Sequence, residues 1–429
     1  MDAPPQHPFP GYRPRVSEKD IEDALSRRGA VLIEGVRWCG KTWTALRFAR
    51  SALRLDDDDA LRLADIDPGE ALRGDAPRLV DEWQNAPHLW NRIRRECDER
   101  PDLGQFILTG SASPSDDVTR HTGTGRIGRV TLRPMSLFET GASDGSVSLR
   151  GLFAGEATSG MARDDIGLRD IASHICIGGW PANIGVEEGK ARRSVRDHLH
   201  ESVLVDIRAA SGVRHDRERV LNLVRSVARN VATEARTAKL VADMAGENGE
   251  GGIWRQTANE YLTALRRIFL LEDQPSWPVH LRSRAVLRKA PKLHLVDPSL
   301  AAAALRASPE QLISDIKTLG FLFESLVVRD LRVYSQPDQA SVYHYRDSDN
   351  LEVDAVVARN DGAWMAVEIK LGHRPDTIDA AAAGLLRLRD KVTASRRSDL
   401  AGLVVVTALG PAYRRRDGIH VVPITALGP

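Results

Sequence analysis

The sequence predicts an α/β protein built from several domains. Its 429 residues suffice for two to four domains at roughly 150 residues each. Near the N-terminus an apolar run, 30–33, leads into a glycine-containing loop and then into a helix-like stretch that begins near Trp43. Near the C-terminus, two apolar segments that suit buried strands, 403–406 and 420–424, follow a helix-like segment, 380–390. Strands and helices at both ends of the chain indicate the α/β class.

Composition and charge narrow the class of protein further. Lys and Arg number 60 against 59 Asp and Glu, so any surface for nucleic acid must be local. Three distant cysteines, Cys39, Cys97 and Cys176, indicate neither a disulfide framework nor a zinc cluster, which fits a reducing cytoplasm. Residues 1–15 lack an apolar signal core, and the longest apolar run, 400–409, is too short to span a bilayer. We therefore expect a cytoplasmic protein with no membrane partner.

The loop that follows the first apolar run, residues 35–42, reads GVRWCGKT and has the spacing of a nucleotide-binding P-loop. In such a loop Gly35 and Gly40 let backbone N–H groups close around phosphate, and Lys41 reaches the β- and γ-phosphates. The hydroxyl of Thr42 coordinates Mg²⁺. The strand before the loop and the helix after it favour this interpretation over an ordinary glycine turn. The sequence thus predicts a chain that binds and hydrolyses ATP with Mg²⁺.

Two further strand-like segments supply the other groups that ATP hydrolysis needs. The strand-like segment 78–80, apolar at Leu79 and Val80, leads to Asp81, which would hold Mg²⁺, and to Glu82, which would orient or deprotonate the attacking water. The run that begins at Gln105 ends in Thr109 and Ser111, either of which suits a contact with the γ-phosphate or the attacking water. A plain polar turn also explains these two hydroxyl residues.

Together with the stretch 128–139, which reads GRVTLRPMSLFE, these motifs resemble a prokaryotic group of AAA-type ATPases, a family of uncharacterised ATP-binding proteins. The resemblance covers nearly the whole chain and implies an AAA-type P-loop domain over residues 1–150. It also implies a charge-stabilising role for Arg129, with Arg126 close by. An arginine that acts in trans would require a homo-oligomer. Exposed arginines that flank a strand are the alternative account of both residues.

The middle of the chain is predicted to be mostly helical. Residues 151–215 combine a Gly-Gly-Trp-Pro turn with helix-like stretches, which suggests a helical lid. Residues 216–305 contain three helix-like segments in the order of a winged helix. The third of these has a polar face suited to a DNA major groove, formed by Arg255, Gln256, Asn259 and Arg266. A basic run over 282–292 follows, which suits either a phosphate backbone or a solvated face. Winged helices also serve as connectors or protein-binding modules.

The last predicted domain, residues 306–429, carries acidic residues at suggestive places. Glu324 lies in a helix-like segment, Asp354 ends a strand, and Glu368 and Lys370 share one face of the next strand because they are two residues apart. This order resembles the core of PD-(D/E)xK nucleases. The resemblance implies that Asp354 and Glu368 bind Mg²⁺ or Mn²⁺, that Lys370 stabilises or activates the hydrolytic water, and that Glu324 supports the site.

Two classes of function follow from these motifs. In the first, an ATP-driven enzyme acts on DNA and cuts it with Asp354, Glu368 and Lys370. In the second, an ATP-dependent switch or adaptor binds a protein partner, and the nuclease-like domain is catalytically inactive. The architecture expected in both cases is an AAA-type P-loop domain, a helical lid, a winged-helix-like connector and a PD-(D/E)xK-like α/β domain.

Overall fold

The computed structural model describes residues 11–112, 124–156, 158–160, 166–203, 207, 216–244, 253–279 and 290–429. The chain divides into two compact units. The first comprises Met1–Pro134, Leu204–His215 and Ala264–Leu270, and the second comprises Met135–Val203, Asp216–Thr263 and Leu271–Pro429. The four domains expected from sequence stay a prediction. Of the predicted basic run, Arg282, Arg284, Arg288 and Lys289 lie outside the described residues.

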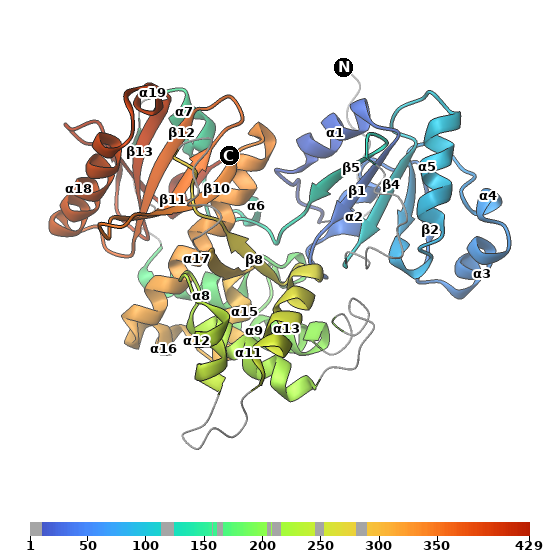
Figure 1. The fold of residues 1–429 in the computed structure, drawn as a ribbon, viewed down its shortest axis with the longest axis horizontal. Coiled ribbons are helices and arrows are strands. Elements are labelled where there is room, and N and C mark those ends of the chain that lie inside the picture. Colours follow the sequence, from blue (N-terminus) through green and yellow to red (C-terminus); the bar gives the residue numbers. More distant parts are fainter. Residues whose placement is uncertain are drawn as a thin grey trace. The chain divides into compact units, whose positions relative to one another are not determined.

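The first unit is built on a five-stranded sheet in the order β2-β3-β4-β1-β5 (Figure 1). Every pair of neighbouring strands in this sheet is parallel. The strands are β1 (Ala30–Glu34), β2 (Ser51–Arg54), β3 (Arg78–Asp81), β4 (Phe106–Gly110) and β5 (Ile127–Thr131). The helices are α1 (Glu18–Arg27), α2 (Lys41–Leu46), α3 (Asp58–Ile66), α4 (Pro68–Ala71) and α5 (Leu89–Glu99). Strand β4 therefore lies between the strand before the P-loop and the strand that ends in Asp81.

The core of the first unit follows from its near-continuous apolar strands, which is the pattern of a parallel sheet covered on both faces. Leu32, Val80 and Leu108 from the three central strands belong to one buried cluster. Trp90 and Ile93 on α5 complete it, because residues three apart on a helix share a face. This packing fixes the carboxyl ends of β1, β3 and β4 at one edge of the sheet.

The first half of the second unit is mainly helical. Its elements up to the third predicted helix are α6 (Leu137–Thr140), β6 (Val147–Ser148), α7 (Leu149–Phe153), β7 (Ser159–Gly160), α8 (Leu168–Ile177), α9 (Glu188–Glu201), α11 (Arg217–Arg229) and α12 (Thr237–Met244). The third predicted helix is α13 (Arg255–Arg267), which belongs to the second unit up to Thr263 and to the first unit from Ala264 on. An antiparallel pair follows, formed by β8 (Leu271–Gln274) and β9 (Lys292–Leu295). Three helices occur where the three helix-like segments were expected, a strand pair follows them, and their interpretation as a winged helix stays a prediction.

The rest of the second unit is a seven-stranded sheet with helices, in the order β10-β11-β12-β13-β15-β14-β7. Its strands are β10 (Ser341–Arg346), β11 (Glu352–Ala358), β12 (Trp364–Lys370), β13 (Leu400–Thr407), β14 (Ala412–Arg414) and β15 (His420–Pro423), and β16 (Leu427–Gly428) pairs with β6. The helices are α15 (Pro298–Leu305), α16 (Pro309–Ser314), α17 (Ile316–Ser335), α18 (Pro375–Lys391) and α19 (Ala394–Ser398). Strands β10, β11 and β12 are antiparallel neighbours, whereas β12, β13 and β15 run parallel.

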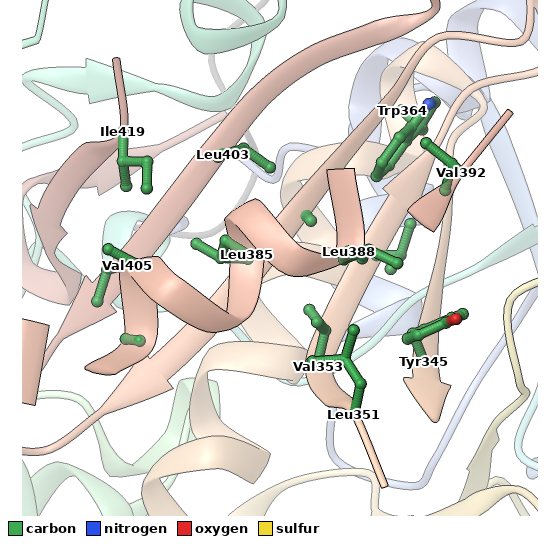
Figure 2. Close-up of a cluster of buried hydrophobic side chains, with 14 of the residues drawn as sticks. Tyr345, Leu351, Val353, Trp364, Leu385, Leu388, Val392, Leu403, Val405 and Ile419 are labelled. Atoms are coloured by element: carbon green, nitrogen blue, oxygen red, sulfur yellow. The ribbon is translucent and has the colours of Figure 1, made fainter. Parts of the chain in front are cut away.

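Helix α18 covers this sheet through one apolar stripe. Figure 2 shows Leu385 and Leu388 of α18 in one buried cluster with Val353 of β11 and Val405 of β13. Trp364, at the start of β12, belongs to the same cluster and is fully buried. Within the described residues, no helix is long and apolar enough to cross a membrane.

Candidate functional site

The P-loop connects β1 to α2 in the first unit. Gly40, the residue before α2, has φ +99°, a left-handed conformation that glycine adopts without strain. Gly35 is required for another reason, because a Cβ atom on it would lie 2.1 Å from the carbonyl oxygen of Leu132. Lys41 is buried, and its Nζ donates to the carbonyl oxygen of Val36 (2.9 Å) inside the loop. The loop is thus closed around its own lysine.

The hydroxyl of Thr42, at the start of α2, contacts the carboxylate of Asp81, at the end of β3. Thr42 Oγ1 donates to Asp81 Oδ1 (2.9 Å), and Thr109 Oγ1, at the end of β4, donates to the same carboxylate oxygen. Asp81 and Thr109 are both buried. A hydroxyl and a carboxylate side by side form the oxygen donor set that Mg²⁺ prefers when substrate phosphates and water complete its shell. These residues therefore fit a Mg²⁺ ion.

Glu82, directly after the strand, is oriented by its backbone and by its neighbours. Its φ of +54° is left-handed, which is uncommon for a residue other than glycine. Its backbone N–H donates to Thr109 Oγ1 (3.2 Å). Its Oε2 accepts from Gln84 Nε2, and Ser111 Oγ lies 3.5 Å away. Sequence reasoning assigned no role to Gln84, although its position two residues after Glu82 made it a candidate.

A second cluster of charged residues forms in the second unit, around the residues expected from the nuclease-like order. Lys370 Nζ lies 2.9 Å from Glu368 Oε2, so these two side chains share one face of β12, as the alternation along a strand predicts. Lys370 Nζ also lies 3.3 Å from Asp354 Oδ2 on the neighbouring strand β11. Asp354 Oδ2 also accepts from the backbone N–H of Ile369 (2.8 Å). Among the described residues, no group of three or more His, Cys, Asp or Glu is arranged to hold a metal ion.

Lys292 occupies the other side of this cluster. The sequence predicts that Lys292 belongs to a basic run on the surface, and this prediction is wrong, because the side chain is only 2% exposed. Its Nζ lies 2.7 Å from Glu324 Oε1, 2.9 Å from Glu352 Oε1 and 3.8 Å from Asp354 Oδ1. Glu324 joins the cluster from α17 and accepts a hydrogen bond from Lys292, and its role in supporting a metal site stays a prediction. Glu352 shares a face of β11 with Asp354, a signal that sequence reasoning left unused.

Comparison with known protein families identifies the first unit's sheet. Residues 27–141 match the family model of an AAA domain. We call this segment the AAA domain after the model that it matches. Residues 168–311 match a domain of unknown function (DUF8612), and residues 319–427 match another domain of unknown function (DUF4143). No curated protein matches the chain.

Three solved structures are similar to this chain at low sequence identity. The Walker-type ATPase of Pyrococcus abyssi is 13% identical, covers 71% of this chain and 99% of its own, and superposes with a TM-score of 0.42. The ORC2 protein of Aeropyrum pernix is 12% identical, with 73% and 98% coverage and a TM-score of 0.32. The ORC1 protein of Aeropyrum pernix in complex with DNA is 15% identical, with 73% and 96% coverage and a TM-score of 0.24.

In the AAA domain, the two candidate arginines are both paired with carboxylates. Arg129, on β5, lies 2.9 Å from Glu34 Oε2 and stacks over the ring of Trp90, with 5.7 Å from its guanidinium carbon to the ring centroid. Burial raises the pKa of Glu34, and the charge of Arg129 opposes that rise. Arg126 lies 2.7 Å from Asp98. The role of Arg129 as a charge-stabilising arginine stays a prediction.

In the charged cluster of the second unit, burial and neighbouring charges raise the pKa of two carboxyl groups and lower that of a third. Burial and the nearby charge of Asp354 raise the pKa of Glu324 to about 8. Burial, followed by the charge of Asp354, raises the pKa of Glu368 well above its usual value. Burial alone would raise the pKa of Asp354 too, but the charges of Lys370 and Lys292 hold it below its usual value. Asp354 is therefore the ionised centre of the cluster.

Proposed function

We propose that the AAA domain binds ATP with Mg²⁺ and hydrolyses it. The observation that carries the proposal is the 2.9 Å hydrogen bond from Thr42 to Asp81. It joins the end of the P-loop to the end of β3, two segments that a nucleotide site must bring together. Thr42 and Asp81 would hold the Mg²⁺ ion, whose charge would offset the negative charge that develops on the phosphates. The match of residues 27–141 to an AAA domain supports the same activity.

Each residue of the site has a distinct role in this proposal. Lys41 exchanges its contact with the Val36 carbonyl for the phosphates, and the backbone N–H groups of the loop bind the same oxygens. Glu82 orients the attacking water and accepts its proton. Thr109 already donates to Asp81, whereas the hydroxyl of Ser111 lies beside Glu82. This arrangement favours Ser111 as the contact of the water or γ-phosphate, and Thr109 as the residue that orients Asp81.

The proposal is tested by separating nucleotide binding from turnover in the full chain. Lys41→Ala should abolish both, because the phosphates lose their cation. Glu82→Gln should keep ATP binding and lower the turnover number by roughly 10²-fold or more, because the water loses its base. Glu70→Gln is the matched control, since Glu70 lies on α4 in the same unit and forms an exposed ion pair with Arg73. Turnover unchanged in both Lys41→Ala and Glu82→Gln would refute the proposal.

An exposed aromatic and basic surface at the start of α13 favours DNA as the partner. Trp254 is 84% exposed just before α13, and Arg255 and Gln256 beside it are exposed as well. An exposed aromatic ring next to a cation suits a nucleic acid, because bases stack on such rings while the cation holds phosphate. Asn259, also on the predicted DNA-binding face, accepts a hydrogen bond from Thr237 Oγ1 (2.7 Å). The DNA proposal therefore relies on the N-terminal end of this face, at Trp254, Arg255 and Gln256.

The alternative, a switch or adaptor for a protein partner, is separated from this by one experiment. DNA should stimulate ATP turnover of the wild type, and Trp254→Ala should lower that stimulation while it leaves turnover without DNA unchanged. Ile66→Ala is the matched control, because Ile66 is 83% exposed on α3. If DNA leaves turnover unaffected and is not bound in a filter assay, the adaptor proposal takes its place.

A further inference from the structure

The acidic cluster of the second unit already contains a cation. Three carboxylates, those of Glu324, Glu352 and Asp354, lie 2.7, 2.9 and 3.8 Å from the Nζ atom of Lys292. They come from two elements, α17 and β11, and the lysine comes from a third, β9. An ammonium group donates three hydrogen bonds and therefore suits a site with several acidic partners.

The same oxygens would be the ligands of a divalent ion. A Mg²⁺ ion needs oxygen ligands at about 2.1 Å in near-octahedral geometry, and Mn²⁺ also prefers carboxylate and water ligands. Asp354 Oδ2 is engaged by Lys370 Nζ and by the backbone N–H of Ile369, while its Oδ1 faces Lys292. A metal could bind only if Lys292 left its place, which would leave a buried ammonium without its acidic partners. The residues present therefore do not fit a divalent ion.

Lys292 is held in place by the strand that carries it. Lys292 pairs in register with Gln274 of β8. His294, two residues further and on the same face of β9, contacts Ser325 Oγ (3.1 Å) and Gln274 Oε1 (3.0 Å). Gln274 Nε2 in turn donates to the carbonyl oxygen of Asp354 (3.0 Å). These bonds fasten β9 to α17 directly and to β11 through Gln274 of β8, so the strand that carries Lys292 is held beside the cluster.

We propose that Lys292 is the resident cation of this cluster and joins β9 to α17 and β11 in place of a divalent metal. The cluster therefore does not cleave phosphodiester bonds. The cluster then acts as a clamp between the β8–β9 pair and the seven-stranded sheet. The two lysines, Lys292 and Lys370, are the cations beside the four carboxyl groups of the cluster. This inference is independent of the ATPase proposal, and its test is made without nucleotide.

The test measures Mn²⁺ binding and thermal unfolding of the full chain, in EDTA and in Mn²⁺. Asp81→Asn is present throughout to remove the metal position of the P-loop. We expect no Mn²⁺ binding that depends on Asp354 in this background, and the same melting temperature in both buffers. Adding Lys292→Met removes the resident cation. That variant should melt lower in EDTA and regain roughly 3 °C or more in Mn²⁺, because a ligand that binds only the native state stabilises it.

Two controls keep the result interpretable. Lys391→Met removes an exposed lysine that contacts Asp347 (2.5 Å) and Asp349 (2.6 Å) in the same unit, and it should gain no response to Mn²⁺. Asp354→Asn, added to Lys292→Met, should abolish the gained response. If Lys292→Met does not fold, the comparison of the wild-type cluster with Asp354→Asn decides alone. Mn²⁺ binding or DNA cleavage that Asp354→Asn removes from the wild-type cluster overturns the proposal, as does a folded Lys292→Met variant without a metal response.

Discussion

Arg15 holds the P-loop at the carbonyl oxygen of Cys39, to which its Nη1 donates at 2.8 Å. Its Nη2 donates to the carbonyl oxygen of Arg133 (2.6 Å), and the residue is only 6% exposed. Cys39 Sγ also donates to the carbonyl oxygen of Leu132 (3.2 Å). The nucleotide-binding loop is therefore fixed by Arg15, which belongs to no sequence motif, and by the backbone of Leu132 in the stretch 128–139.

Arg15→Ala should weaken ATP binding without touching the phosphate-binding residues. Two buried carbonyl groups lose a charged donor, which costs about 1–3 kcal/mol for each group left unsatisfied. We expect a lower melting temperature and a higher Kd for ATP, measured by calorimetry on the same preparations. Arg27→Ala is the control, because Arg27 pairs with Asp23 on the surface of α1 and should change neither quantity. An unchanged Kd in Arg15→Ala would show that the loop keeps its conformation without this contact.

Gly35→Ala should disable the loop by a different route. The added Cβ would lie 2.1 Å from the backbone carbonyl oxygen of Leu132, and a backbone atom cannot move aside cheaply. We expect a loss of about 2–4 kcal/mol in the free energy of unfolding together with loss of ATP binding. Gly320→Ala gives the opposite result, because the nearest atom to its Cβ is 3.7 Å away and Gly320 lies inside α17. Removing a helical glycine should add about 0.5–1 kcal/mol.

Gln84 should hold the carboxylate of Glu82 in the orientation that catalysis needs. Its Nε2 donates to Glu82 Oε2 and lies 3.4 Å from Ser111 Oγ, so it holds the carboxylate beside the hydroxyl. Gln84→Ala should lower kcat by roughly tenfold and leave the KM for ATP close to its wild-type value, because no phosphate contact is lost. Gln84→Glu, which cannot donate to a carboxylate at neutral pH, should behave like the alanine variant. A change in KM alone would assign Gln84 to nucleotide binding instead.

The sequence identified those parts of the molecule whose residues are neighbours along the chain. Lys41 and Thr42 follow from the P-loop spacing, and the shared face of Glu368 and Lys370 follows from strand alternation. Lys292 could not be placed in this way. It follows a run of arginines in sequence, and only the pairing of β9 with β8 and the packing of β9 near α17 turn it inward. Contacts between elements far apart in sequence depend on tertiary packing, which local patterns do not contain.

The same limit applies to a buried arginine at the centre of the second unit. Arg329 Nη1 lies 2.7 Å from Asp297 Oδ2, and its Nη2 lies 2.7 Å from Asp330 Oδ1. Asp297 also accepts from the backbone N–H of Gly179 (3.0 Å), and Asp330 accepts from that of Leu137 (3.1 Å). A single guanidinium thereby connects α15 and α17 with the Gly-Gly-Trp-Pro turn and with α6.

Arg329→Met should therefore be among the most destabilising single substitutions in the second unit. It leaves the two buried carboxylates without their cation, and removing one partner of a buried ion pair costs about 3–5 kcal/mol. Arg169→Met is the matched control, because Arg169 also pairs with two carboxylates, those of Glu188 (2.5 Å) and Glu310 (2.9 Å), but is half exposed. We expect that control to cost less than about 1 kcal/mol. Equal losses in denaturant unfolding of the two variants would mean that Arg329 contributes through its methylene packing and not through its charge.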